Sequence, residues 1–422
     1  MGIEFGRRKE IASLLEARGN GKIKVIEGLR QVGKSYLLNT LYLKELLRLG
    51  VKSDEIAMLD FLRKDDDIRD EVSLKARIRS LLSERRIAYL FLDEVQLVEG
   101  YGDALKTLHA QHPEVDIYVT GSNSKTLSKD IERELGAEDS FEIVLRPLTY
   151  AEIRQDLPSF AFSDYFAYGG IPKILLCLGE EDKRKELSSL YRDTYAKDIL
   201  NRSEDLKSIG EKEKKKILQR VFDTITTGVS LKSIAREINA DNKAEHKNSS
   251  EVHAEVDTYL ERLSESFLFE AMEEDISASK EGSRKTIEDR GKCYCADPGL
   301  LRFASRSKDL DSAVYENLVF THLLSKGYKP ISLKFDYYDP LINEPCSNRG
   351  IDFCFEKEGI TYLVQAVLNL YGGNAYQREV HNLLFCDKQG RKIVVYSKDY
   401  SGDHPDSEGI EFMQIEDFLF EI

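Results

Sequence analysis

No apolar run in these 422 residues approaches the roughly 20 residues that a membrane-spanning helix needs. The N-terminus, MGIEFGRRKEIASLL, is basic, but it lacks the long apolar stretch and the small-residue cleavage site of a signal peptide. Gly6 also stands where an N-myristoylation signal requires serine or threonine. The sequence therefore predicts no association with a membrane, and a cytoplasmic location.

Cysteine is sparse, and its six residues form no C-x-x-C pair. This spread indicates reduced thiols in a cytosolic protein. Cys293 and Cys295 alternate along a predicted strand, and we expect no metal there. No arrangement of serine or cysteine with histidine suggests nucleophilic catalysis.

Positive charge is in deficit, with 61 lysines and arginines against 75 aspartates and glutamates, a net charge of -14 and a pI of about 5.2. A protein that grips nucleic acid strongly and non-specifically is usually basic, so this balance argues against a protein that coats DNA. It leaves open a local basic face on one domain.

Strand-like and helix-like segments alternate over residues 22–146. The strand-like runs are apolar and lie at 22–28, 55–61, 87–93, 116–121 and 141–147. Apolar strands that alternate with helices predict a parallel sheet with both faces covered. We therefore expect an α/β domain over residues 1–147, and the chain length suggests two or three domains in total.

The remaining residues change pattern twice. Residues 148–228 are helical in pattern and predict a lid or linker region. Residues 229–300 show two helices separated by a polar loop at 239–250, then two strand-like segments around a charged stretch at 276–290 that we expect to be mobile. This is the outline of a winged helix-turn-helix. Residues 301–422 predict a separate α/β module.

The stretch GLRQVGKS fits the P-loop pattern G-x-x-x-x-G-K-[ST] without exception. Its glycines let successive backbone N–H groups point at phosphate oxygens, and the following helix N-terminus adds partial positive charge. We expect Lys34 to reach the β- and γ-phosphates of ATP and Ser35 to coordinate Mg²⁺. The predicted nucleotide-binding residues are Gly28, Leu29, Arg30, Gln31, Val32, Gly33, Lys34 and Ser35.

Two carboxylates, Asp93 and Glu94, end the apolar run that begins at Tyr89. In an open parallel sheet, ligands bind at the carboxyl ends of the strands. We expect Asp93 to hold Mg²⁺ through water and Glu94 to polarise the attacking water. The next strand closes with VTGSN, where Asn123, or Ser122 beside it, is the candidate for orienting that water; an ordinary turn is the alternative.

With this P-loop, an Asp-Glu pair and a polar third strand end, the chain resembles AAA+ type ATPases. More narrowly, it is similar to a prokaryotic family of unassigned biological role that joins an AAA core to a winged helix and a C-terminal restriction-endonuclease-like domain. The resemblance covers nearly the whole chain. It rests on the order of the motifs GLRQVGKS, LFLDEVQ, TGSNS, LRPLTYAE, YGGIPKIL, YAKDILNR, YCADPGL, YENLVFTHL, IDFCFE, YLVQAV and REVHNLL. It implies ATP and Mg²⁺ as cofactors.

One position departs from that family, which usually has Gly-Arg before the strand at 141, whereas this chain has Gly136-Ala137. That arginine would contact the γ-phosphate, so its absence weakens the expectation of efficient hydrolysis. Arg133 and Arg146 are the alternatives, although each also fits a solvated or packing role.

The predicted recognition helix, residues 251–265, carries five carboxylates against Arg262 alone. Helices that read DNA need arginine, lysine, asparagine or glutamine toward the groove, and this one would repel phosphate. A winged helix that packs against the ATPase or a partner is the competing interpretation. The basic stretch Lys212–Arg220 is another candidate for phosphate contacts, or simply a solvated helix face.

The C-terminal module resembles nuclease-like folds that place Asp, then Glu/Gln-x-Lys, on neighbouring strands, where the carboxylates hold Mg²⁺ and the lysine helps activate water. Asp352 fits the first position and Gln365 the second, but Val367 replaces the lysine. Glu316 offers a carboxylate from a helix. With one strand carboxylate and no lysine, we expect no cleavage and a fold kept for binding or assembly.

Together these observations predict a Mg-dependent ATPase that acts as a switch or motor, with association with DNA left open. The alternative is a DNA-binding regulator or assembly scaffold in which ATP only sets conformation. A protein partner or homo-oligomer also remains open, because AAA-type sites often borrow an arginine from a neighbouring subunit.

Overall fold

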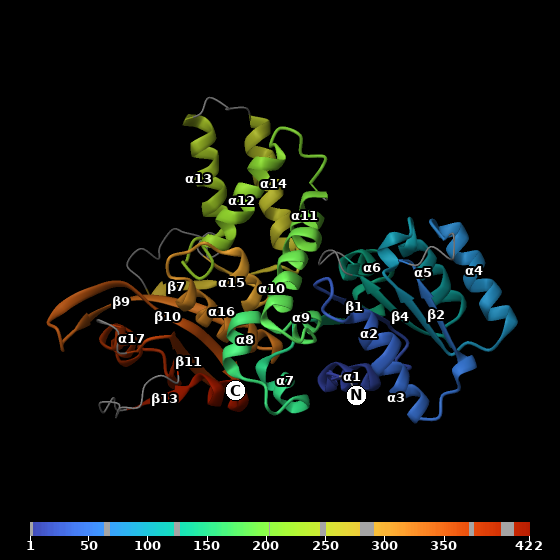
Figure 1. The fold of residues 1–422 in the computed structure, drawn as a ribbon, viewed down its shortest axis with the longest axis horizontal. Helices are drawn as coiled ribbons and strands as arrows, with labels where there is room; N and C mark the ends of the chain where they lie inside the picture. The colour runs from blue at the N-terminus through green and yellow to red at the C-terminus, as the bar shows by residue number, and fades with distance from the viewer. Residues whose placement is uncertain are drawn as a thin grey trace. The chain divides into compact units, whose positions relative to one another are not determined.

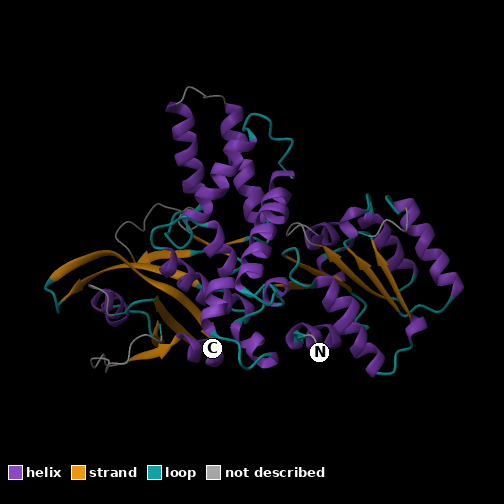
Figure 2. Ribbon diagram, in the orientation of Figure 1, coloured by secondary structure: helices purple, strands orange, loops and turns teal. Residues whose placement is uncertain are grey.

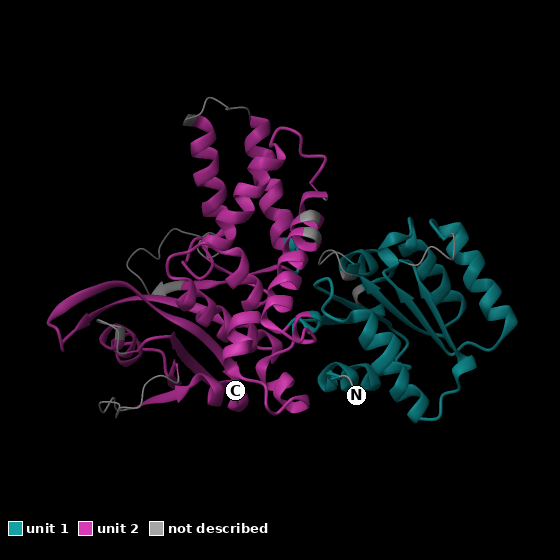
Figure 3. Ribbon diagram, in the orientation of Figure 1, with its two compact units in different colours: residues 1–147, 171–173, 265–267 teal, residues 148–170, 174–264, 268–422 magenta. Residues whose placement is uncertain are grey.

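The computed structural model describes residues 3–62, 68–121, 127–201, 203–244, 250–278, 291–370, 375–397 and 409–422. The chain separates into two units, coloured teal and magenta in Figure 3. The first contains Met1–Pro147, Ile171–Lys173 and Glu265–Phe267, and the second contains Leu148–Gly170, Ile174–Ser264 and Leu268–Ile422.

Five strands form the sheet of the first unit, and every neighbouring pair is parallel, as predicted. Their order across the sheet is β2-β3-β4-β1-β5. Their bounds are β1 Ile23–Gly28, β2 Ile56–Asp60, β3 Tyr89–Asp93, β4 Asp116–Gly121 and β5 Ser140–Leu145. All of β1 is buried, because it lies between two strands and beneath helices.

Helices cover both faces of this sheet (Figures 1 and 2). Alternate residues of β3 show the two faces, since Leu90 and Leu92 join the core that α4 and α5 cover, whereas Phe91 packs against Tyr42 and Tyr118. The helices are α1 Arg8–Glu16, α2 Lys34–Tyr36, η1 Leu37–Tyr42, α3 Leu43–Arg48, η2 Ser53–Glu55, α4 Glu71–Glu84, η3 Val95–Leu97, α5 Tyr101–Gln111, α6 Leu127–Leu135 and η4 Ala137–Asp139.

Helices follow one another from Tyr150 to Asp223, as the pattern predicts. They are α7 Tyr150–Asp156, α8 Phe162–Tyr168, α9 Pro172–Leu175, α10 Glu180–Ser189, η5 Leu190–Ala196, α11 Lys197–Asn201 and α12 Glu211–Asp223.

The next segment contains the elements of the winged-helix outline. These are α13 Leu231–Ala244, α14 Ser250–Glu265 and an antiparallel pair formed by β6 Phe269–Met272 and β8 Lys292–Cys295. The expected loop at 239–250 was wrong over its first part, because good helix formers such as Ala240 and Ala244 continue α13. The winged-helix assignment itself stays a prediction.

A mixed six-stranded sheet completes the second unit, in the order β13-β12-β11-β10-β9-β7. Its strands are β7 Glu274–Ala278, β9 Ile331–Asp339, β10 Glu344–Lys357, β11 Ile360–Val367, β12 Arg391–Tyr396 and β13 Ile410–Gln414. Its helices are α15 Pro298–Ala304, α16 Leu310–Ser325, α17 Ala375–Leu384 and α18 Ile415–Glu421. The prediction of a mobile stretch was wrong for 276–278, because β7 pairs with β9, a distant segment that local pattern does not reveal.

A buried carboxylate joins two motifs of the second unit. Asp297 is fully buried and caps α15, accepting the backbone N–H of Leu300 at 3.0 Å and that of Gly170 at 2.7 Å. The chain passes so closely here that a methyl group at Gly170 would lie 1.8 Å from the carbonyl oxygen of Leu148. This contact gives a physical reason for the YGGIPK and CADPGL motifs.

Burial raises the pKa of Asp297 to about 6, although its backbone hydrogen bonds oppose the shift. A carboxyl whose folded pKa exceeds its unfolded value stabilises the protein most when protonated, so this contribution falls as pH rises from about 4 to about 6. Asp297→Asn removes the titrating group. It also lowers stability by an amount that does not depend on pH, because the amide oxygen can accept only one of the two N–H groups of Gly170 and Leu300. Free energies of unfolding measured from pH 4.5 to 7 should show wild type losing about 2 kcal/mol relative to the variant. Parallel pH profiles for the two proteins would contradict this.

Candidate nucleotide site

The P-loop connects β1 to α2 through a turn that only particular residues allow. Gly28 has φ +147°, and a Cβ there would lie 2.2 Å from the carbonyl oxygen of Leu145 in β5. Gln31 and Gly33 have φ values of 62° and 103°, in the left-handed region. The loop therefore turns back at the carboxyl end of β1, the edge of the sheet where ligands bind.

Lys34 folds back over this loop. Its Nζ donates to the carbonyl oxygens of Gly28 at 3.1 Å and Leu29 at 3.0 Å, and the side chain is buried. Burial lowers the pKa of Lys34 to about 8, while nearby Glu94 and Asp93 favour the charged form. A desolvated ammonium group attracts an anion more strongly than an exposed one does.

The carboxylate of Asp93 receives hydrogen bonds from three elements. Ser35 Oγ donates to Oδ1 at 3.0 Å, Asn39 Nδ2 donates to Oδ2 at 3.2 Å, and Thr120 Oγ1 donates to Oδ1. Burial raises the pKa of Asp93, and the hydroxyl groups of Thr120 and Ser35 oppose this. The structure thus brings Ser35 and Asp93, the two predicted Mg²⁺ ligands, into direct contact.

Glu94 lies beside this cluster in a strained backbone conformation, with φ 60°. Its N–H donates to Thr120 Oγ1 at 2.9 Å, and Gln96 Nε2 donates to its Oε2 at 2.5 Å. Thr120 therefore bonds both carboxylate residues. Sequence reasoning missed Thr120, Gln96 and Asn39, although Thr120 ends the strand next to β3 and Asn39 lies one helical turn after Ser35.

The remaining candidates are two polar residues after β4 and two arginines. Asn123 and Ser122 lie outside the described residues. Arg133 is exposed and pairs with Asp130 at 3.1 Å. Arg146 directly follows Leu145, the register partner of Gly28, so its backbone lies at the edge of the sheet where the P-loop begins.

The oxygen donors fit Mg²⁺. Among the described residues, no group of three or more His, Cys, Asp or Glu side chains could hold a metal alone. Magnesium, however, commonly takes one or two protein ligands together with phosphate oxygens. Ser35 and Asp93 supply that small donor set.

Residues 20–154 match the family model of an AAA domain. The first unit therefore contains an AAA domain. Residues 159–311 match a domain of unknown function (DUF8612).

Two curated relatives align over most of the chain. An uncharacterized protein of Haemophilus influenzae is 26% identical over 99% of both chains, and one of Methanocaldococcus jannaschii is 25% identical over 94% of this chain and 85% of its own. Among solved structures, a Walker-type ATPase of Pyrococcus abyssi superposes with a TM-score of 0.41 at 15% identity, covering 71% of this chain and 95% of that chain. In the part of this chain that the structure describes, we find no helix with the length and apolarity to cross a bilayer.

A second ionisable cluster lies in the other unit, around the nuclease-like candidates. Val367 does replace the motif lysine, but Lys292 of β8, which the motif did not reveal, donates to Glu316 at 2.7 Å and to Asp352 at 3.2 Å. Burial raises the pKa of Glu316 to about 7 and Lys292 opposes it. Burial lowers the pKa of Lys292, but the carboxylates of Glu316 and Asp352 outweigh this effect and raise the pKa overall. Tyr294 also donates to Glu316, at 2.8 Å.

Gln365 extends this cluster, as its position on β11 predicts. Its Oε1 accepts the N–H of Asp352 at 2.7 Å, and its Nε2 donates to Gly350 at 3.0 Å and to Glu379 at 2.6 Å. Every polar atom of the Gln365 amide is thus used in fixing β10 against β11 and α17.

Lys292→Met should destabilise the second unit by about 2–3 kcal/mol, toward the low end for a broken buried ion pair, because it leaves two partly buried carboxylates without their counter-charge. Lys334→Met is the matched control, since Lys334 is a half-buried lysine of the same unit, 4.0 Å from its partner Glu274. Urea unfolding followed by circular dichroism would compare them. Adding Glu316→Gln should recover part of the loss, and equal effects of the two lysine variants would contradict an essential ion pair.

Proposed function

We propose that the AAA domain binds Mg-ATP and hydrolyses it, and that this cycle drives a conformational change in the rest of the chain. The observation that carries the proposal is the Asp93 cluster, in which the residue after the P-loop lysine contacts the carboxylate that ends β3. The AAA match over residues 20–154 supports the same assignment.

Each residue has a separate task in this proposal. The Lys34 ammonium binds the β- and γ-phosphates, exchanging its two carbonyl partners for phosphate oxygens. Ser35 and Asp93 hold Mg²⁺, which neutralises phosphate charge when bound. Glu94 accepts a proton from the attacking water. Thr120 positions Glu94, because its Oγ1 accepts the backbone N–H of Glu94. We assign the γ-phosphate contact to Arg146 rather than Arg133, because Arg146 follows the register partner of Gly28.

Lys34→Ala should abolish saturable ATP binding, since it removes the buried cation at the loop, and isothermal titration calorimetry would measure this. Glu94→Gln should keep ATP affinity within about threefold and lower turnover by a factor of 100 or more, the scale of a lost general base. Unaltered turnover would remove Glu94 from this role.

Two arginine variants make a matched pair in the same phosphate-release assay. Arg146→Ala should slow turnover with little change in ATP affinity, whereas Arg133→Ala should leave both unchanged because Arg133 is exposed and paired with Asp130. The reverse ranking would overturn the assignment of Arg146.

For the nuclease-like module we propose binding or assembly rather than cleavage. The ammonium group of Lys292 pairs with both Glu316 and Asp352, so a divalent cation would have to displace Lys292 from these ion pairs. Supercoiled plasmid incubated with Mg²⁺ or Mn²⁺ should therefore remain intact. Metal-dependent nicking that Asp352→Asn abolishes would contradict this proposal.

The alternative function is a DNA-binding regulator in which ATP only sets conformation, and the winged-helix outline motivates it. The carboxylates of α14 weigh against reading DNA with this helix. Glu255, for example, accepts the backbone N–H groups of Lys207, Ser208 and Ile209, so it anchors the loop before α12. Duplex binding at low salt, unaffected by Glu94→Gln, is the result that would favour this alternative over the ATPase.

A further inference from the structure

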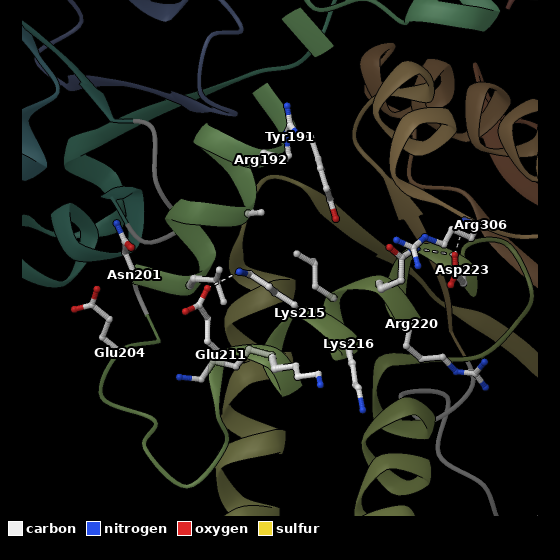
Figure 4. Close-up of a pocket in the computed structure, with 16 residues that line it drawn as sticks. Tyr191, Arg192, Asn201, Glu204, Glu211, Lys215, Lys216, Arg220, Asp223 and Arg306 are labelled. Atoms are coloured by element: carbon white, nitrogen blue, oxygen red, sulfur yellow. Dashed lines mark hydrogen bonds and ion pairs between the residues drawn. The ribbon is translucent and has the colours of Figure 1, made fainter. Parts of the chain in front are cut away.

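A groove in the second unit is lined by cations from three separate segments (Figure 4). Its volume is about 1050 Å³. Arg192 comes from η5, Lys212 and Lys216 from α12, and Arg306 from the loop after α15. The basic run seen in the sequence is therefore one wall of a concave site to which distant residues add charge.

The amphipathic character of α12 explains why its lysines face the groove. Ile217, Val221 and Phe222 are buried on one side of the helix, which leaves Lys212 and Lys216, four residues apart, exposed on the other. The buried Lys214 donates to the backbone carbonyl oxygens of Ser203 and Leu206 and so ties the neighbouring loop to α12.

The cations of the groove differ in whether a carboxylate already neutralises them. Lys215 pairs with Glu211, and Arg220 pairs with Glu237 at 2.7 Å.

Arg192, Lys212, Lys216 and Arg306 have no ion-pair partner among the described residues. Two carboxylates of the same lining, Glu204 and Asp223, likewise have no ion-pair partner among the described residues, and Asp223 accepts the backbone N–H of Arg306 at 2.6 Å. In a chain of net charge -14, four unpaired cations against two carboxylates around one concavity are a local reversal of sign that a polyanion would complement.

The groove also has an apolar part, which indicates which class of polyanion fits it. Leu200, Leu218 and Tyr191 line it, and Tyr191 is held by edge-on contacts to Phe222 and Phe303 at ring distances of 5.6 Å. Single-stranded nucleic acid presents phosphates and exposed base faces together, whereas a duplex hides its base faces in the stack. An acidic peptide supplies the charge but no flat aromatic surface.

We propose that this groove binds single-stranded nucleic acid, with Arg192, Lys212, Lys216 and Arg306 contacting phosphates and Tyr191 with its apolar neighbours contacting bases. This binding goes beyond the ATPase and does not depend on hydrolysis. The predicted recognition helix takes no part in it, because its cation Arg262 forms a two-bond ion pair with Asp205, at 2.6 and 2.8 Å.

The test uses the full chain and a fluorescein-labelled 30-residue oligothymidylate, with anisotropy read from 50 to 200 mM KCl. The variant Lys216→Gln/Arg306→Gln removes two phosphate contacts from different segments. It should weaken binding about tenfold and reduce the magnitude of the slope of log K against log salt by about 1.4. The matched control is Arg184→Gln/Lys185→Gln, which removes two exposed charges of α10 outside the groove and should change neither value.

Further measurements separate this proposal from the ATPase proposal and from binding of a duplex or an acidic peptide. Lys34→Ala should lose ATP binding and retain the oligonucleotide, so failure of one proposal is distinguishable from failure of the other. An unlabelled duplex or polyglutamate should compete at least tenfold less well than the unlabelled single strand. No binding at 50 mM KCl, equal losses in the variant and its control, or equal competition by duplex or polyglutamate would each overturn the proposal. Unchanged circular dichroism of the variants shows that any loss is not due to unfolding.

Discussion

A carboxylate removed from water must have its oxygens hydrogen-bonded, and in the AAA domain that requirement falls on Asp93. Its bonds from Ser35, Asn39 and Thr120 connect α2, η1 and β4 to the end of β3. Since Thr120 also accepts the N–H of Glu94, the same network sets where the second carboxylate lies. The distance between the phosphate-binding loop and the proposed general base is thus fixed by one buried group.

The second unit uses buried charge in the same way, between segments that are distant in sequence. Asp297 joins the glycine pair after α8 to the start of α15. Lys292, on a strand of the predicted winged helix, pairs with Glu316 and Asp352 of the C-terminal module. Breaking either contact leaves a desolvated charge, so each one enforces a specific arrangement of segments even where its net contribution to stability is small.

Charged residues nearer the surface serve two different purposes in the second unit. The carboxylates of α14 that argue against DNA reading include Glu255, which satisfies three backbone N–H groups of the loop before α12. Lys214 also holds this loop, by donating to the carbonyl oxygen of Leu206. These internal bonds shape the wall of the groove, which Lys212 and Lys216 line. An acidic protein can therefore carry a basic binding surface, because net charge says nothing about where the charges gather.

The local sequence determined the parallel sheet, the P-loop and the position of Asp93 and Glu94, since apolar periodicity and a fixed motif spacing act over a few residues. It also placed Asp352 and Gln365 on neighbouring strands, which pair as β10 and β11.

Tertiary structure alone decided which distant residues meet. The positioning role of Thr120, the lysine between Glu316 and Asp352, the pairing of β7 with β9 and the convergence of Arg192 and Arg306 on α12 all join segments far apart in the chain. No local pattern encodes such contacts. They form because a buried polar group needs a hydrogen-bond or ion-pair partner, and folding supplies that partner from a distant part of the chain.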